Sequence, residues 1–254
     1  MDRTLLKTNA KQQLGGSIFA ENWLLGLVSF LIFSTMLGMA SSVLLGIFGL
    51  FGSGSFIKTM MELSNSVMTD PESLPPDYMI GLMNKTILPL YGGALCAGLI
   101  ANVLITGPFT YGLCKTFYDL VMGGERVKLD TVFSGFRKYG ETVLLGFMVS
   151  LFTALWSLLF IVPGIVKAFA YSMSYYVKAE HPEYTWRQCM DQSQSLMRGY
   201  KGRYFVLQLS FIGWYIVGSL AFGIGVLWVY PYHECTNANF YAWLTAQKRT
   251  EIFE

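Results

Sequence analysis

The stretch TVLLGFMVSLFTALWSLLFIVPGIV, residues 142–166, decides the fold because it carries no charged side chain from end to end. A helix that crosses roughly 30 Å of hydrocarbon needs about 20 apolar residues, and this stretch supplies them before it reaches Pro163. After Lys167 the apolar character resumes and continues through Val177. We therefore expect a membrane helix, a tight turn at Pro163–Gly164, and a second helix.

Three further uncharged stretches extend this pattern: Asn22–Ile57, Thr86–Cys114 and Tyr204–His233. The last is too long for one span and too short for two, and Gly223 and Gly225 interrupt it near its middle. Its second helix must therefore continue into the polar residues that follow. The sequence predicts an all-α membrane protein with six transmembrane helices in three hairpins. We expect these helices at residues 23–51, 86–114, 142–162, 165–178, 204–222 and 225–246.

The composition agrees with a membrane protein. The 254 residues are 53% hydrophobic and 13% charged, whereas soluble proteins are about 25% charged. The chain has 18 basic and 16 acidic residues, a near balance that excludes the broad basic surface of a nucleic-acid-binding protein. Two histidines are too few for the histidine-rich iron centres of membrane oxygenases and desaturases. The first 20 or so residues are polar, which is not typical of a cleaved signal.

The positions of lysine and arginine predict the orientation, because short cytoplasmic loops are enriched in them. Fifteen of the 18 basic residues fall in segments that we therefore assign to the cytoplasm: residues 1–22, 115–141, 179–203 and 247–254, with Lys178 at the edge of the third. The segment 52–85 has two basic and four acidic residues and is expected to be the extracellular loop. Both termini are then cytoplasmic. We expect the whole chain, residues 1–254, to form a single polytopic domain in the plasma membrane.

A short stretch with helical periodicity precedes each hairpin on the basic side. These stretches are Thr4–Leu14, Leu129–Tyr139 and the region from Thr185 to Gly199, where Thr185 and Gln188 have the spacing of a capping box. Such helices tend to lie in the headgroup plane, with apolar side chains toward the lipid. We expect three cytoplasmic amphipathic interfacial helices. Weak similarity between the segments beginning at Ser157 and Ser219 favours a repeated plan, although any two apolar hairpins resemble each other.

Several separate motifs, in order along the chain, resemble those of a known protein family. The chain resembles domain-of-unknown-function family 975, whose members are bacterial integral membrane proteins found mainly in Gram-positive lineages. The resemblance covers most of the chain except residues 52–85, and it implies no biochemical role. The motifs are Leu6-Lys7 with Ala10-Lys11, residues 133–139, residues 163–168 with 171–173, residues 195–199, residues 207–214 and residues 239–241.

Polar side chains concentrate on the second, fourth and sixth expected helices. Because polar groups are costly against lipid, these helices should face one another or a wet cavity, shielded by the other three. Glu234 lies roughly 14 Å along its helix from the Gly225 turn, which is near the membrane midplane or already at the cytoplasmic interface. Lys167 either snorkels to the headgroups or pairs internally. The residues of this candidate polar groove are Thr110, Lys115, Asp119, Lys167, Ser172, His233, Glu234, Asn237 and Asn239.

The same polar residues also admit plainer interpretations. Lys115 and Asp119, four residues apart, form either an interfacial ion pair or the mouth of the groove. Hydrogen bonds between helices explain the asparagines and threonines equally well. No catalytic motif, metal-ligand set or cofactor motif occurs, so we expect no cofactor.

Three functions remain. The first is a non-enzymatic module that binds or passes an amphipathic substrate, a peptide or a lipid, through a polar cytoplasm-facing groove. The second is an interaction or regulatory subunit of a membrane transport or secretion complex. The third, an intramembrane enzyme, lacks paired acids and a nucleophile–base pair. The expected partners are membrane lipid, a peptide or lipid substrate, or another membrane protein, and the oligomeric state is open.

Overall fold

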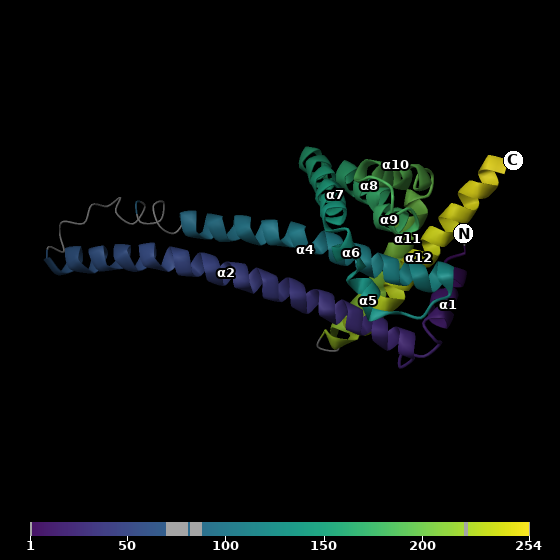
Figure 1. The fold of residues 1–254 in the computed structure, drawn as a ribbon, viewed down its shortest axis with the longest axis horizontal. Helices are drawn as coiled ribbons and strands as arrows, with labels where there is room; N and C mark the ends of the chain where they lie inside the picture. Colours follow the sequence, from purple (N-terminus) through teal and green to yellow (C-terminus); the bar gives the residue numbers. More distant parts are fainter. Residues whose placement is uncertain (1, 70–80, 82–87, 221–222, 254) are drawn as a thin grey trace. The chain divides into compact units, whose positions relative to one another are not determined.

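A computed structural model describes residues 2–69, 81, 88–220 and 223–253 (Figure 1). Every regular element in these residues is an α-helix, as predicted. The chain divides into two compact units, residues 1–34 with 105–254 and residues 35–104. The helices are α1 (Arg3–Gln13), α2 (Glu21–Thr69), α4 (Leu88–Gly123), α5 (Leu129–Val132), α6 (Ser134–Arg137), α7 (Tyr139–Leu159), α8 (Ile161–Tyr171), α9 (Ser174–Glu180), α10 (Trp186–Leu196), α11 (Lys201–Leu220) and α12 (Ile224–Phe253).

Two stretches of these helices, Glu21–Val43 and Tyr139–Leu159, are long and apolar enough to cross a membrane. Only 17% of each stretch is buried inside the structure. Core helices of soluble proteins are mostly buried, so the low burial suits helices that face lipid. Among the described residues no further helix meets the same test, and the six-span arrangement stays a prediction.

Helices α2 and α4 are longer than the expected spans. The prediction that the first helix ends at Phe51 is wrong, because α2 continues to Thr69 through the first part of the expected loop 52–85. Charge and polarity end a membrane span but not a helix, and no proline occurs before Pro71. Helix α4 likewise runs past Cys114 to Gly123. The rest of the expected loop lies almost entirely outside the described residues.

The turn between α7 and α8 lies at Phe160, not at Pro163–Gly164 as predicted. Phe160 has an extended backbone (φ −157°, ψ 141°), and α8 starts at the next residue. Pro163 therefore lies in the first turn of α8, where its missing N–H removes a donor that has no partner within the helix. The proline pattern located the hairpin correctly but placed its turn three residues too late.

The expected fourth span, 165–178, consists of two short helices. Helix α8 ends at Tyr171 and α9 begins at Ser174, with Ser172 and Met173 between them. The buried Ser193 hydroxyl of α10 accepts a hydrogen bond from the Met173 backbone N–H and donates one to the Ala170 carbonyl. This side chain satisfies backbone groups where the helix is interrupted. The last hairpin turns at Gly223, as predicted, with a positive φ of 79° that glycine adopts without strain.

The expected amphipathic helices pack against protein. Leu6 and Ala10 of α1 are buried, as is Leu14 just after it, and α1 packs on α12. Cys189, Met190 and Leu196 of α10 are buried in the same core. The expectation that these apolar faces point into lipid is therefore wrong for α1 and α10, because both faces have protein to cover. The capping box of Thr185 and Gln188 is confirmed. The expected helix 129–139 is divided into α5 and α6, and α7 begins at Tyr139.

Helices α4 and α7 cross with their backbones in close approach at Gly107 and Gly146. A Cβ atom added to Gly146 would lie 2.9 Å from the Gly107 Cα and 2.9 Å from the Tyr175 hydroxyl. Only glycine leaves room for this crossing. The candidate site is lined by residues that follow the crossing on both helices, including Thr110 and Cys114 of α4 and Val149 and Ser150 of α7.

Candidate functional site

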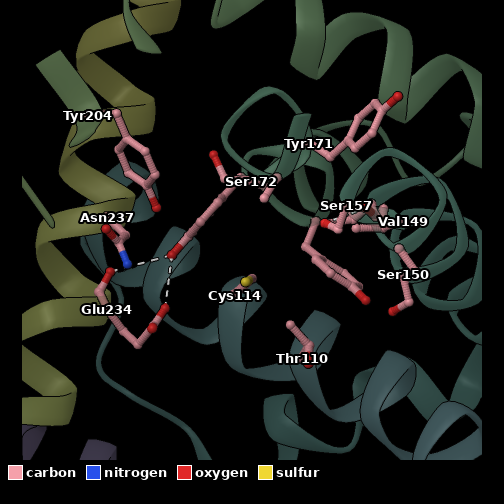
Figure 2. Close-up of a pocket in the computed structure, with 15 residues that line it drawn as sticks. Thr110, Cys114, Val149, Ser150, Ser157, Tyr171, Ser172, Tyr204, Glu234 and Asn237 are labelled. Atoms are coloured by element: carbon pink, nitrogen blue, oxygen red, sulfur yellow. Dashed lines mark hydrogen bonds between the residues drawn. The ribbon is translucent and has the colours of Figure 1, made fainter. Parts of the chain in front are cut away.

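A cavity of about 590 Å³ lies in the larger unit, among helices α4, α7, α8, α9, α11 and α12. Figure 2 shows Glu234, Asn237 and Tyr204 on one side and Val149, Ser150 and Ser157 on the other. Most of the fifteen lining side chains carry a hydroxyl. The lining residues are Thr110, Cys114, Val149, Ser150, Thr153, Ala154, Ser157, Ala168, Tyr171, Ser172, Tyr175, Tyr176, Tyr204, Glu234 and Asn237.

The cavity has a buried end and an exposed end. Cys114, Tyr176 and Asn237 are buried, while Ser150 and Ser157 are exposed on α7. The exposed end lies beside apolar residues of the same helix, including Leu151 and Leu155. A cavity with polar groups in its interior therefore opens through a mouth bordered by side chains that suit lipid.

Among the described residues that line the cavity, Glu234 is the one carboxylic acid. The Tyr176 hydroxyl lies 3.3 Å from the Glu234 Oε2 and 3.4 Å from the Glu234 carbonyl oxygen, and it donates to both acceptors (Figure 2). Helix α12 supplies the acid and α9 supplies the tyrosine. These contacts join two helices that are distant in the chain and hold the acid at the buried end.

A chain of hydrogen bonds between α11 and α12 stabilises the buried end of the cavity. His233 Nε2 lies 2.5 Å from the Gln208 Oε1, and His233 Nδ1 lies 2.9 Å from the Tyr215 hydroxyl. Because Gln208 Oε1 can only accept, Nε2 carries the proton and Nδ1 accepts from Tyr215. Gln208 Nε2 in turn donates to Asn237 Oδ1 at 2.8 Å. His233 therefore helps to position Asn237 and does not itself line the cavity.

The structure brings together four of the nine residues expected in the groove: Thr110, Ser172, Glu234 and Asn237. Thr110 comes from α4, Ser172 follows α8, and the other two lie on α12. These positions belong to the second, fourth and sixth expected helices. The remaining five candidates lie elsewhere, and each has a partner of its own.

Lys167 donates a hydrogen bond to Gln194 Oε1 at 3.2 Å and lies 5.1 Å from the centre of the Trp156 ring. Lys115 and Asp119 form an ion pair at 3.0 Å, with 29% and 27% of their side chains exposed. Asn239 donates to Gln13 and so joins α12 to the residue that ends α1. Together with His233, these residues stabilise contacts around the cavity without entering it.

Two of the helices expected to shield the polar centre, the third and the fifth, also line the cavity. Helix α7, the third expected span, supplies five lining residues, and α11, the fifth, supplies Tyr204. Ser150, Thr153 and Ser157 recur along α7 at intervals of three and four residues, which places them on one face of the helix. This spacing was the signal in the sequence that could have found them. Tyr175 and Tyr176 gave no comparable signal, because tyrosine is common near membrane interfaces.

The residues that line the cavity can form hydrogen bonds to a ligand and can carry one negative charge. It offers one carboxylic acid, one amide and several hydroxyls, with no basic side chain among the lining residues. In the described residues, no three histidine, cysteine, aspartate or glutamate side chains lie together as a metal site. The geometry therefore favours recognition of a polar group.

Comparison with known protein families gives a match to one part of the chain. Residues 160–248 match the family described as "Protein of unknown function (DUF975)". This match confirms the resemblance expected from the sequence motifs. The matched DUF975 residues include more than half of the cavity lining, from Ala168 to Asn237. Neither the curated proteins nor the solved structures contain a match to the chain.

Proposed function

We propose that this protein is a non-enzymatic module of the bacterial plasma membrane that binds an amphipathic molecule in the cavity around Glu234. The observation that carries the proposal is a partly buried cavity, lined by several hydroxyls and one carboxylic acid, in a helical chain with an apolar exterior. Polar groups inside a membrane are energetically costly, so those that occur there usually have a function. A ligand with a polar head and an apolar tail matches both the interior and the mouth.

The proposal includes the six-span topology, with both termini in the cytoplasm. Its support is the match between the paired helices and the expected hairpins, together with exposed apolar residues on α11, such as Ile216, Val217 and Leu220. A reporter fused after Glu254 tests the orientation. Green fluorescent protein should fluoresce there and alkaline phosphatase should be inactive. An active phosphatase at this position would contradict the topology.

The position of the mouth changes the expected route of access. Ser157 is close to the end of α7 that joins α8 at Phe160, which is the outer end in the proposed topology. A cavity that opens there meets lipid before it meets the cytoplasm. We therefore replace the cytoplasm-facing groove by a cavity with a lateral opening toward the bilayer.

Labelling of Cys114 tests whether the cavity is accessible. One variant keeps Cys114 and replaces Cys96, Cys189 and Cys235 by alanine. A matched variant keeps only Cys235, which is also buried but does not line the cavity. N-ethylmaleimide, which is neutral and enters lipid, should label Cys114 several-fold faster than Cys235 in intact membranes. Equal rates would show that the cavity is closed to small molecules and would overturn the proposal.

A further inference from the structure

The cavity has an acid with no basic partner. Glu234 lines it, and none of the other lining side chains is basic. Within the part of the chain that the structure describes, Glu234 takes part in none of the ion pairs. A half-buried carboxylate without a countercharge is costly. A cationic group on a ligand would supply the countercharge that the described residues do not provide.

Two basic groups on helices that line the cavity have other partners. Lys167 donates to Gln194, and Lys115 pairs with Asp119. His233, which precedes Glu234 on α12, uses both ring nitrogens in its contacts with Gln208 and Tyr215. A rearrangement that brought one of these groups to Glu234 would break its present contacts.

The hydroxyls around Glu234 also favour a ligand that donates hydrogen bonds. The Tyr176 hydroxyl donates its hydrogen bond to Glu234, and the Ser172 hydroxyl donates its hydrogen bond to the Phe169 carbonyl at 2.8 Å. Both oxygens are left with lone pairs that accept. An ammonium group has three donors and no acceptor, so it complements a carboxylate surrounded by accepting oxygens. An anionic head would meet the carboxylate without any compensating cation.

We infer that the cavity binds a lipid-like amphiphile whose polar head is an ammonium group. This inference rests on the proposed binding function of the cavity. The ammonium pairs with Glu234 at the buried end, and the alkyl tail leaves past Ser150 and Ser157 toward the apolar side chains beside the mouth. A lipid-like molecule fits this exit better than a peptide, whose backbone polar groups would be costly there.

Protection of Cys114 provides the test, because Cys114 lines the same cavity. The variant that keeps only Cys114 is placed in phosphatidylcholine nanodiscs and labelled with N-ethylmaleimide at pH 7. Dodecylamine, dodecanol and dodecanoate share one chain length and differ in the head group. Dodecylamine is a cation at this pH. We expect it to halve the labelling rate at a concentration about tenfold lower than either of the others, because a charge-assisted hydrogen bond is markedly stronger than a neutral one.

A second variant, Glu234→Gln, removes the charge and keeps the size of the side chain. In the Cys114 background it should label at the unprotected rate of the parent and lose the preference for the amine. If this variant fails to fold, the three ligands on the parent protein decide alone. Equal or better protection by dodecanol or dodecanoate would overturn the ammonium head while leaving the binding cavity intact. Protection by none of the three, nor by trileucine amide, would contradict the binding function itself. Protection by trileucine amide without protection by dodecylamine would overturn the lipid-like ligand.

Discussion

Tyr176 donates a hydrogen bond to Glu234, a residue 58 positions later in the chain, across 3.3 Å at the buried end of the cavity. The contact fixes α9 against α12 and orients the single carboxylic acid of the lining. Neither residue belongs to a recognisable motif. The binding proposal depends on the orientation that this contact gives to the acid.

Replacing Tyr176 by phenylalanine removes this hydroxyl and keeps the ring. We expect Tyr176→Phe to lower the free energy of unfolding by about 1 kcal/mol, as for one lost hydrogen bond to a buried acceptor. The control is Tyr175→Phe, since the Tyr175 hydroxyl donates no hydrogen bond to another of the described residues. Thermal unfolding of the detergent-solubilised variants measures both. An equal loss in the two variants would mean that the contact with Glu234 contributes nothing specific.

The crossing of α4 and α7 should tolerate no side chain at Gly146. Gly146→Ala would place a methyl group 2.9 Å from the Gly107 Cα, so we expect a loss of about 1–3 kcal/mol from overpacking. Gly140→Ala in the same helix meets open space and should be neutral or slightly stabilising. The same unfolding measurement compares them. Equal stability of the two variants would rule out the close approach.

Lys178 is a buried cation that sequence reasoning placed only at the edge of a cytoplasmic segment. Its side chain is fully buried, and it donates to Glu141 Oε2 and to the carbonyls of Pro182 and Tyr184. Lys178→Met leaves both carbonyls without this donor, and we expect a loss of about 2 kcal/mol. Glu141→Gln should cost about 1 kcal/mol or less, because 59% of the Glu141 side chain is exposed. The reverse order in urea unfolding would contradict this account.

Cys189 should react slowly with thiol reagents and faster as the pH rises. Burial raises the pKa of its thiol to about 11, so the reactive thiolate is scarce at neutral pH. Below that pKa, the thiolate fraction, and with it the labelling rate, rises about tenfold per pH unit. A variant that keeps only Cys189 is labelled with N-ethylmaleimide between pH 7 and pH 9. A constant rate over this range would exclude an elevated pKa.

Local patterns in the sequence predicted the features that depend on neighbouring residues. The capping box at Thr185 and the turn at Gly223 each follow from side-chain or backbone chemistry within a few residues. The concentration of polar groups on three of the six expected helices drew attention to Glu234 and Asn237, which line the cavity in the structure. These residues were found because polar groups are rare in apolar stretches.

Features that depend on packing were not predictable in this way. The division of the fourth expected span into α8 and α9 depends on Ser193, which comes from α10. His233 appeared to be a groove residue because of its polarity, but Gln208 and Tyr215 hold it outside the cavity. Apolar periodicity alone could not show that α1 covers protein and not lipid, because both surroundings are apolar.

The central claim is that the cavity around Glu234 holds an amphipathic molecule. Native mass spectrometry of the protein purified from its own membrane tests it most directly. Ser150→Trp fills the mouth, whereas Leu151→Trp alters the neighbouring residue on the same helix, which does not line the cavity. We predict that the wild type and Leu151→Trp retain one bound amphiphile and that Ser150→Trp loses it. Equal retention by all three proteins, or no bound amphiphile in the wild type, would contradict the account.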